Sequence, residues 1–146
     1  MTPLMQQIKA KAEQLHRHIV LPDATDERAI RASRIITDEK LAAISLVGNE
    51  NEIRSKAAQI GVMLDGVHVV DPEKSDTLHQ YTDTYFELRK AKGMRPDLAL
   101  QTMKKPMFFG AMMVREGAAH GSVAGSLSTT GDLLRAGIQV IAAAAR

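Results

Sequence analysis

The sequence contains no cysteine and no tryptophan, and its other aromatic residues are only two Tyr and three Phe. Without cysteine there is no disulfide framework, no thiolate metal site and no cysteine nucleophile. A chain without disulfides suits a reducing compartment, so we expect a cytoplasmic location. So few aromatic residues do not suit a surface that stacks nucleobases, and a formal net charge of +2 is too small to indicate nucleic-acid binding.

Long hydrophobic runs are absent as well. No segment approaches the roughly 18 consecutive apolar residues that a membrane-spanning helix needs. The charged N-terminal segment lacks the apolar core of a secretory signal, so we expect no membrane association. The 146 residues are 45% apolar, which suits one domain with a core of aliphatic residues and Met. We expect four methionines to fill that core: Met103, Met107, Met112 and Met113.

Short apolar runs alternate with segments of helical periodicity along the whole chain. The expected strands are 18–22, 41–48, 66–72 and 121–126. The expected helices are 3–16, 23–40 with Thr25 or Asp26 as its cap, 49–61, 75–92, 95–103, an apolar helix from Pro106, and one from about Asp132 to the end. This alternation is typical of an α/β domain with three layers, in which helices cover both faces of a parallel sheet.

Ligands of such sheets bind at the carboxyl ends of the strands, so the loops after the expected strands are the informative ones. The segment GSLSTTGDLLR, residues 125–135, follows the last strand and contains Ser128, Thr129 and Thr130. Its hydroxyl groups and the N–H groups of the following helix suit an anion, and Arg135 can lean back toward them. The segment lacks the lysine and the spacing of the phosphate loop GxxxxGK[ST]. Ordinary helix capping is the alternative.

Other charged residues carry weaker signals. Arg89 borders the apolar face of the helix 75–92, where it is either solvated or a second cation for an anionic substrate. We expect the basic residues around it to form solvated surface: Lys90, Lys92, Arg95, Lys104 and Lys105. Capping and turn roles are expected for Asp23, Asp26 and Glu27. His16 and His18 can share one face of a strand, but no cysteine or acidic residues complete a ligand set, so we expect no metal site.

Several segments in order resemble one enzyme family. They are IVLPDATDERAIRAS, LVGNENEIRSKA, VVDPEKSD, YFELRKAKGM, FFGAMMVREG and GSLSTTGDLLRAGIQVI. Each is weak alone, but their order and spacing along nearly all 146 residues are specific. The chain resembles the N-terminal part of the phosphate acetyltransferase, or phosphotransacetylase, family.

The resemblance implies a fold shared with the isocitrate dehydrogenase group, in which two α/β domains face a cleft, and it implies a homodimer. It implies acetyl transfer between acetyl-CoA and phosphate, giving acetyl phosphate and CoA, with no permanently bound cofactor. Arg89 and Arg135 match the family's two N-terminal arginines and are the expected catalytic residues. Ser128, Thr129 and Thr130 match its hydroxyl loop and are expected to line the phosphate or acetyl phosphate site with both arginines.

The resemblance covers only part of the family's pattern. Its aspartate general base and a Ser-Arg pair belong to the C-terminal half and have no counterpart here. We therefore expect residues 1–146 to be an N-terminal domain with little activity alone. The family usually has Pro after the second arginine and Asp-Gly before the fourth strand, where this chain has Ala136 and His120. A butyryl-transferring relative and a non-catalytic binding or assembly module remain as alternatives.

Overall fold

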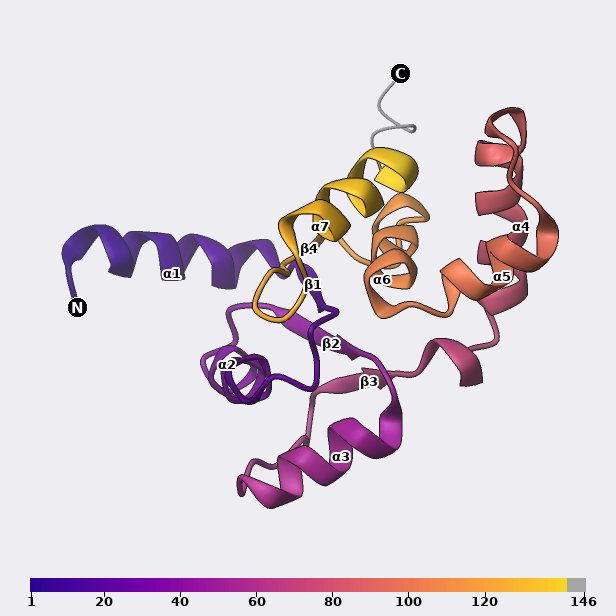
Figure 1. Cartoon of the computed structure of the whole chain (residues 1–146). Coiled ribbons are helices and arrows are strands. Elements are labelled where there is room, and N and C mark those ends of the chain that lie inside the picture. The colour runs from indigo at the N-terminus through magenta and orange to yellow at the C-terminus, as the bar shows by residue number, and fades with distance from the viewer. Residues whose placement is uncertain (142–146) are drawn as a thin grey trace.

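A computed structural model describes residues 1–141 (Figure 1). At its centre is a sheet of four strands: β1 (His18–Leu21), β2 (Ala43–Val47), β3 (His68–Val70) and β4 (Gly121–Ser122). The strands lie in the order β3-β2-β1-β4, and every pair is parallel. The predicted α/β class and parallel sheet are therefore confirmed.

Helices other than the N-terminal one lie on both faces of this sheet. The helices of the described residues are α1 (Pro3–Leu15), α2 (Glu27–Asp38), α3 (Glu50–Gln59), α4 (Leu78–Arg89), α5 (Pro96–Met103), α6 (Pro106–Arg115) and α7 (Thr130–Ala136), with the short 3-10 helices η1 (Pro72–Lys74) and η2 (Lys90–Lys92) and the π-helical η3 (Gly137–Ile141). Side chains alternate between the two faces along β1: Leu21 packs with α2 and α3, whereas Val20 packs with α4, α5 and α6.

The helix α6 is the most buried element of the second core. Seven of its ten residues are buried, as the apolar sequence from Pro106 predicted. The four methionines expected in the core are all buried, at 0–8% exposure. Tyr81 and Tyr85 of α4 add aromatic contacts to Phe109 and Phe108 of α6. Four of the five aromatic residues therefore lie together, between α4 and α6.

Three local predictions differ from the structure or extend beyond the described residues. The predicted strand 121–126 is wrong in length, because the chain turns at Gly125, whose φ is +113°. The predicted shared strand face of His16 and His18 is also wrong, because His16 ends α1 in the left-handed region with φ +49°. The last helix begins at Thr130 rather than near Asp132, and its predicted continuation through 142–146 lies outside the described residues.

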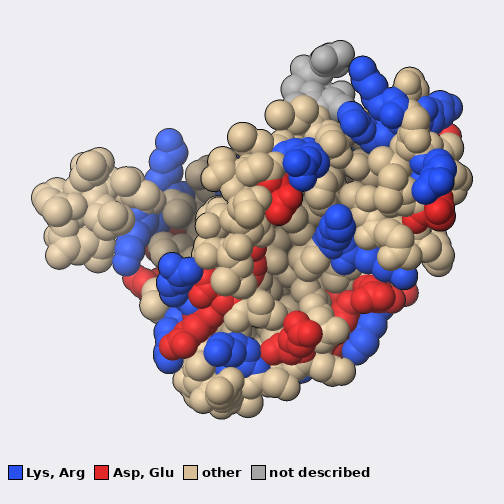
Figure 2. Space-filling view, in the orientation of Figure 1, with Lys and Arg blue, Asp and Glu red and all other residues tan. Residues whose placement is uncertain are grey.

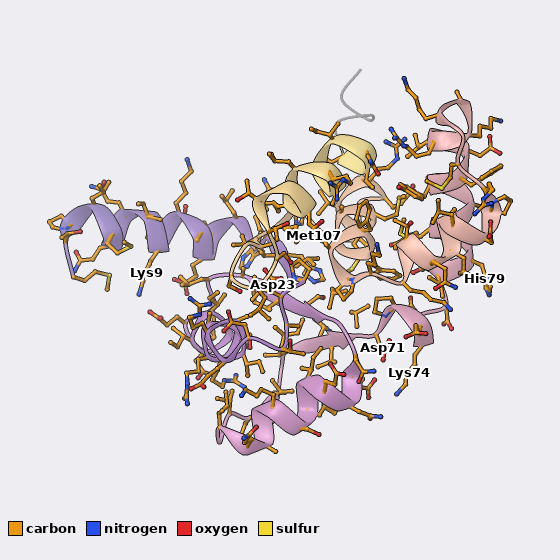
Figure 3. The ribbon with its side chains drawn as sticks, viewed as in Figure 1. Lys9, Asp23, Asp71, Lys74, His79 and Met107 are labelled. Carbon is orange, nitrogen blue, oxygen red and sulfur yellow. The ribbon has the colours of Figure 1, made fainter. Side chains whose placement is uncertain are left out.

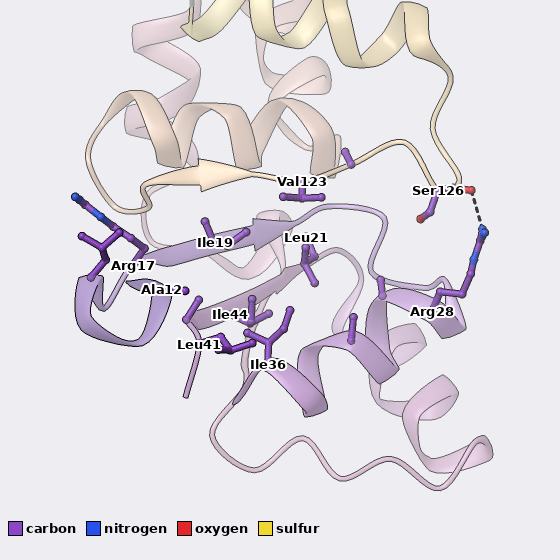
Figure 4. A pocket seen from close by; sticks show the side chains of 15 residues that line it. Ala12, Arg17, Ile19, Leu21, Arg28, Ile36, Leu41, Ile44, Val123 and Ser126 are labelled. Atoms are coloured by element: carbon purple, nitrogen blue, oxygen red, sulfur yellow. Dashed lines mark hydrogen bonds between the residues drawn. The ribbon is translucent and has the colours of Figure 1, made fainter. Parts of the chain in front are cut away.

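The helix α1 extends away from the rest of the molecule (Figure 1), and none of its residues is buried. Beside its end an apolar groove of about 560 Å³ lies between α2 and the β1–β4 side of the sheet (Figure 4). The groove is lined mainly by Ala, Leu, Ile and Val side chains, including Ile19, Leu21 and Val123. The helical cover on this face is therefore incomplete over β1 and β4. Among residues 1–141, no helix is long and apolar enough to span a membrane.

Candidate functional site

The sheet changes direction between β1 and β4. From β1 the chain passes through α2 to β2 and β3 on one side, and it returns through α4–α6 to β4 on the other side. The helices that follow β1 and β4 therefore pack on opposite faces of the sheet, and ligands of open α/β sheets bind at the carboxyl ends of such strands. The strand order therefore indicates that a binding site lies at the loops 22–26 and 123–129.

A cavity of about 440 Å³ opens at this point, and we name it the switch-point pocket. Its lining residues come from the end of β1, α4, the α5–α6 junction and the segment 128–139: Pro22, Tyr85, Thr102, Lys105, Pro106, Met107, Phe108, Ser128, Asp132, Arg135 and Gln139. Two cations and one carboxylate thus face a cavity with a partly apolar lining. The apolar groove has few polar groups to orient a small ligand, so the switch-point pocket is the better candidate.

Two of the predicted site residues, Ser128 and Arg135, line this pocket. Arg135 Nη1 donates to Asp132 Oδ1 at 3.0 Å, and both side chains are more than half exposed. An exposed pair of this kind contributes at most about 1 kcal/mol. An anionic ligand can therefore compete with Asp132 for the guanidinium of Arg135.

The other two hydroxyl residues lie at the start of α7. Thr129 caps this helix, since its Oγ1 accepts a hydrogen bond from Asp132 N at 3.1 Å. Thr130 is the first residue of α7 and is exposed. Neither is among the residues that line the switch-point pocket in the described part of the chain. Helix capping, the alternative interpretation of this segment, describes what Thr129 does in the structure.

Arg89 is the last residue of α4, one turn beyond Tyr85. Tyr85 lines the pocket and donates its hydroxyl hydrogen to Gln139 Oε1 at 2.8 Å. Burial raises the pKa of Tyr85, and the nearby charge of Arg89 acts in the opposite direction. Arg89 does not line the pocket, and its buried Nε has no hydrogen-bond partner within residues 1–141. The structure brings Ser128 and Arg135 together and places Arg89 near the phenol of Tyr85.

Lys105 is exposed, as the sequence predicted, and it also lines the switch-point pocket, which the sequence did not predict. It immediately precedes Pro106, the first residue of α6, and both line the pocket. Figure 2 shows Lys and Arg side chains gathered over the region of α4 and α5, beside the hollow in this face. The Lys-Pro pair was the available signal, because proline favours the first position of a helix and fixes the preceding residue at its start.

Asp23 does more than the turn role expected for it. Its carboxylate is 7% exposed, and Oδ2 accepts from the backbone N–H groups of Gly125 at 2.7 Å and Ser126 at 3.1 Å. Its Oδ1 accepts the hydroxyl hydrogen of Ser128. In Figure 3, Asp23 lies where the end of β1 meets the loop that leads to α7. Asp23 therefore uses the hydroxyl hydrogen of Ser128, a donor that the sequence interpretation had assigned to a bound anion.

Asp26 and Arg28 complete the contact between the two loops. Asp26 caps α2, as predicted, and the hydrogen bonds from Arg28 lower the pKa of Asp26 to about 2. Arg28 Nη2 also donates to the carbonyl oxygen of Ser126 at 3.1 Å (Figure 4). The loop 125–128 is thus fixed by charged residues that follow β1.

Three of the five histidines, His18, His68 and His120, lie at the opposite, N-terminal end of the strands. The backbone N–H of His18 donates to His120 Nδ1 at 2.9 Å, and the rings of His18 and His68 lie 5.7 Å apart. Burial, together with the charges of these neighbours, lowers the pKa of His18. Within the described residues, no group of three or more His, Cys, Asp or Glu side chains is arranged to bind a metal ion.

Comparison with known proteins gives one consistent family. A family model described as "Phosphate acetyl/butaryl transferase" matches residues 3–145. Phosphate acetyltransferase from Acetivibrio thermocellus is 41% identical over 137 residues, which cover 94% of this chain and 41% of that protein. The enzyme of the same name from Thermoanaerobacterium thermosaccharolyticum is 38% identical over 138 residues, covering 94% of this chain and 42% of that protein.

Solved structures agree with the sequence relatives. EutD phosphotransacetylase from Staphylococcus aureus superposes with a TM-score of 0.86 at 26% identity, covering 94% of this chain and 42% of that one. A phosphotransacetylase from Streptococcus pyogenes gives a TM-score of 0.87 at 25% identity, covering 96% and 43%. The chain therefore spans well under half the length of the relatives it matches.

Proposed function

The chain belongs to the phosphate acetyl/butaryl transferase family, and we propose that it supplies the phosphate-binding side of an acyl-transfer site. The reaction is the reversible transfer of acetyl between acetyl-CoA and phosphate. A phosphate oxygen bonds to the acetyl carbonyl carbon, the carbon–sulfur bond breaks, and the proton of hydrogen phosphate ends on the sulfur of CoA, which leaves with acetyl phosphate as the other product. The chain acts as an N-terminal α/β domain, and its partner domain supplies the general base.

The observation that supports this proposal is the placement of Arg135, Lys105 and Ser128 around one pocket at the carboxyl ends of β1 and β4. A guanidinium presents paired N–H donors that suit phosphate oxygens, and an ammonium adds a compact charge. Cations placed beside the transferred group also stabilise negative charge that develops on its oxygens in the transition state. Phosphate binding would break the exposed ion pair between Arg135 and Asp132, which costs less than the contacts to phosphate contribute.

The remaining features of the whole enzyme follow as parts of the proposal. CoA and acetyl-CoA are substrates and not resident cofactors, and no metal takes part. Arg89 acts with Arg135 on the phosphoryl group, for which its guanidinium must reach the pocket that it does not line in this structure. Thr129 and Thr130 contribute to the same site when the second domain closes on it. The enzyme is a cytoplasmic homodimer.

The direct test is binding of inorganic phosphate and acetyl phosphate to this chain, measured by NMR titration. We expect both ligands to shift the amide signals of residues 128–135. Because hydrogen bonds to charged groups contribute about 1.5–3 kcal/mol, Arg135→Ala should weaken phosphate binding about tenfold or more. Arg31→Ala is the matched control, since Arg31 also forms an exposed ion pair on a helix, at 2.8 Å from Glu27.

Other outcomes separate the alternatives. Absence of phosphate binding by the wild-type chain, or equal effects of the two arginine variants, contradicts the proposed site. A comparison of acetyl phosphate with butyryl phosphate tests the acyl preference, since the family includes both activities in its description. Acetyl-CoA formation by this chain alone is expected to be negligible. Robust turnover would contradict the assignment of the general base to another domain.

A further inference from the structure

Two loops that are distant in the sequence meet at Asp23, directly beside the switch-point pocket. Asp23 is separated from Gly125 by 102 positions and from Ser128 by 105 positions. Burial acts to raise the pKa of Asp23, but the hydrogen bonds from Ser128 and from the N–H groups of residues 125–127 outweigh it, so the pKa lies below its ordinary value. Asp23 is therefore a carboxylate at neutral pH.

The charge of Asp23 fixes the direction of its hydrogen bond with Ser128. An ionised carboxylate only accepts hydrogen bonds, so the hydroxyl hydrogen of Ser128 must point to Asp23. A serine hydroxyl has one hydrogen and two lone pairs. With the hydrogen engaged, the hydroxyl of Ser128 can offer only its lone pairs to a molecule in the pocket that Ser128 lines.

An acceptor in an anion site discriminates between anions that are otherwise alike. Inorganic phosphate carries at least one P–OH group at neutral pH and can donate a hydrogen bond to Ser128. Sulfate has a similar size and tetrahedral shape but carries no hydrogen at that pH, so its oxygen would face the lone pairs of Ser128. A buried or partly buried acceptor that faces another acceptor loses its hydrogen bond and its contact with water.

We propose that Asp23 is a specificity-determining positioning residue, which holds Ser128 as a hydrogen-bond acceptor so that the pocket selects hydrogen phosphate over sulfate. The proposal rests on the proposed function and adds to it the protonation state of the inorganic phosphate that the site takes. Asp23 itself does not contact the ligand. It acts through the hydroxyl of Ser128 and through the two backbone N–H groups that fix the loop.

The test is the ratio of phosphate to sulfate affinity, measured by NMR titration at neutral pH. A neutral hydrogen bond is worth about 0.5–1.5 kcal/mol, so we expect wild type to prefer phosphate by up to about tenfold. Asp23→Asn and Ser128→Ala should each lose most of this preference. Removal of the negative charge of Asp23 also strengthens the binding of both anions. The ratio of phosphate to sulfate affinity is used because this effect acts on both affinities.

The double variant and a control test whether Asp23 acts through Ser128. Because the two residues form one unit, Asp23→Asn with Ser128→Ala should show the same ratio as either single variant. Asp38→Asn removes an exposed carboxylate that pairs with Arg34 and should keep the wild-type ratio. Hydrogen exchange of the Gly125 and Ser126 amides should accelerate in Asp23→Asn and not in the control.

The contrary results distinguish a failure of the inference from a failure of the proposed function. If wild type binds sulfate as tightly as phosphate, or if Asp23→Asn keeps the preference, the inference fails and the proposed function stands. Unchanged amide exchange in Asp23→Asn also overturns it, because the loop would then not depend on this carboxylate. If wild type binds neither anion, the proposed function fails and the inference fails with it.

Discussion

Gly110 of α6 lies directly against Val20 of β1, so closely that a Cβ atom on Gly110 would be 2.8 Å from Cγ1 of Val20. Val20 is fully buried, and its short β-branched side chain cannot move away from the helix. The helix α6 can therefore approach the sheet only because residue 110 has no side chain. The same approach brings Pro106 and Phe108 to the switch-point pocket.

Gly110→Ala is expected to destabilise the protein although alanine is the better helix former. Added volume in a packed core costs about 1–3 kcal/mol, which exceeds the gain in helix propensity of about 1 kcal/mol. The loss is measured as the change in free energy of unfolding by urea denaturation. Gly137→Ala is the control, because Gly137 has an ordinary φ of −61° and a Cβ atom added to it would meet no atom within 4 Å among the described residues. A similar loss in both variants would show that the contact with Val20 is not the cause.

The helix α1 is expected to contribute little to stability. Ile8 is 53% exposed, whereas Ile30 of α2 is 0% exposed. Ile8→Ala should change the free energy of unfolding by no more than about 0.5 kcal/mol, as surface substitutions generally do. Ile30→Ala should cost about 2–5 kcal/mol, since it leaves a cavity between α2 and the sheet. Comparable losses in the two variants would mean that α1 packs against the body of the protein in solution.

The sequence was sufficient for the fold because its strands are short apolar runs that alternate with helical periodicity. The central strands β1 and β2 lie within the predicted segments 18–22 and 41–48. The end of β4 was not predictable in this way. Val123 still donates its N–H to the Val20 carbonyl, but the N–H groups of Gly125 and Ser126 bond to Asp23. That partner is 102 positions away, so no local pattern reveals it.

The candidate site also contains residues that local sequence predicted and residues that depend on distant contacts. Ser128 and Arg135 lie within one local segment, and both line the predicted kind of pocket. Lys105 reaches the same pocket because α6 is seated closely on β1, which depends on tertiary packing and not on residues near Lys105. Asp23 looked like a turn residue because its sequence neighbours suit a turn, and its main contacts are with another loop.

Acid should destabilise the protein through Asp26. The pKa of Asp26 is about 2 in the folded protein, below the ordinary value of 3.8, because Arg28 donates to its carboxylate. The unfolded chain then binds this proton more readily than the folded chain. Stability from this group is complete above about pH 4 and is lost as the pH falls toward about 2. The lowered pKa of Asp23 acts in the same direction.

Urea denaturation between about pH 5 and about pH 2.5 measures this loss. Asp26→Asn cannot take up the proton, so its stability should depend less steeply on pH over this range. Asp38→Asn, which removes an exposed carboxylate of α2, should keep the wild-type pH dependence. Identical slopes for wild type and Asp26→Asn would show that the pair of Asp26 and Arg28 does not cause the acid sensitivity.

Lys105 and Lys104 are adjacent in sequence but differ in what they face. Lys105 lines the switch-point pocket, whereas Lys104 lies 3.8 Å from Glu73 and lines a separate cavity at the ends of β2 and β3. Lys105→Ala should weaken phosphate binding by about fivefold, the equivalent of about 1 kcal/mol for an exposed charge. Lys104→Ala changes the net charge equally and should have a smaller effect.

The difference in phosphate affinity between the two lysine variants should shrink as ionic strength rises from about 0.05 M to about 0.5 M, because salt screens exposed charges. Equal weakening by both variants at low salt would mean that phosphate responds to the general basic surface of α4 and α5 and not to a contact with Lys105.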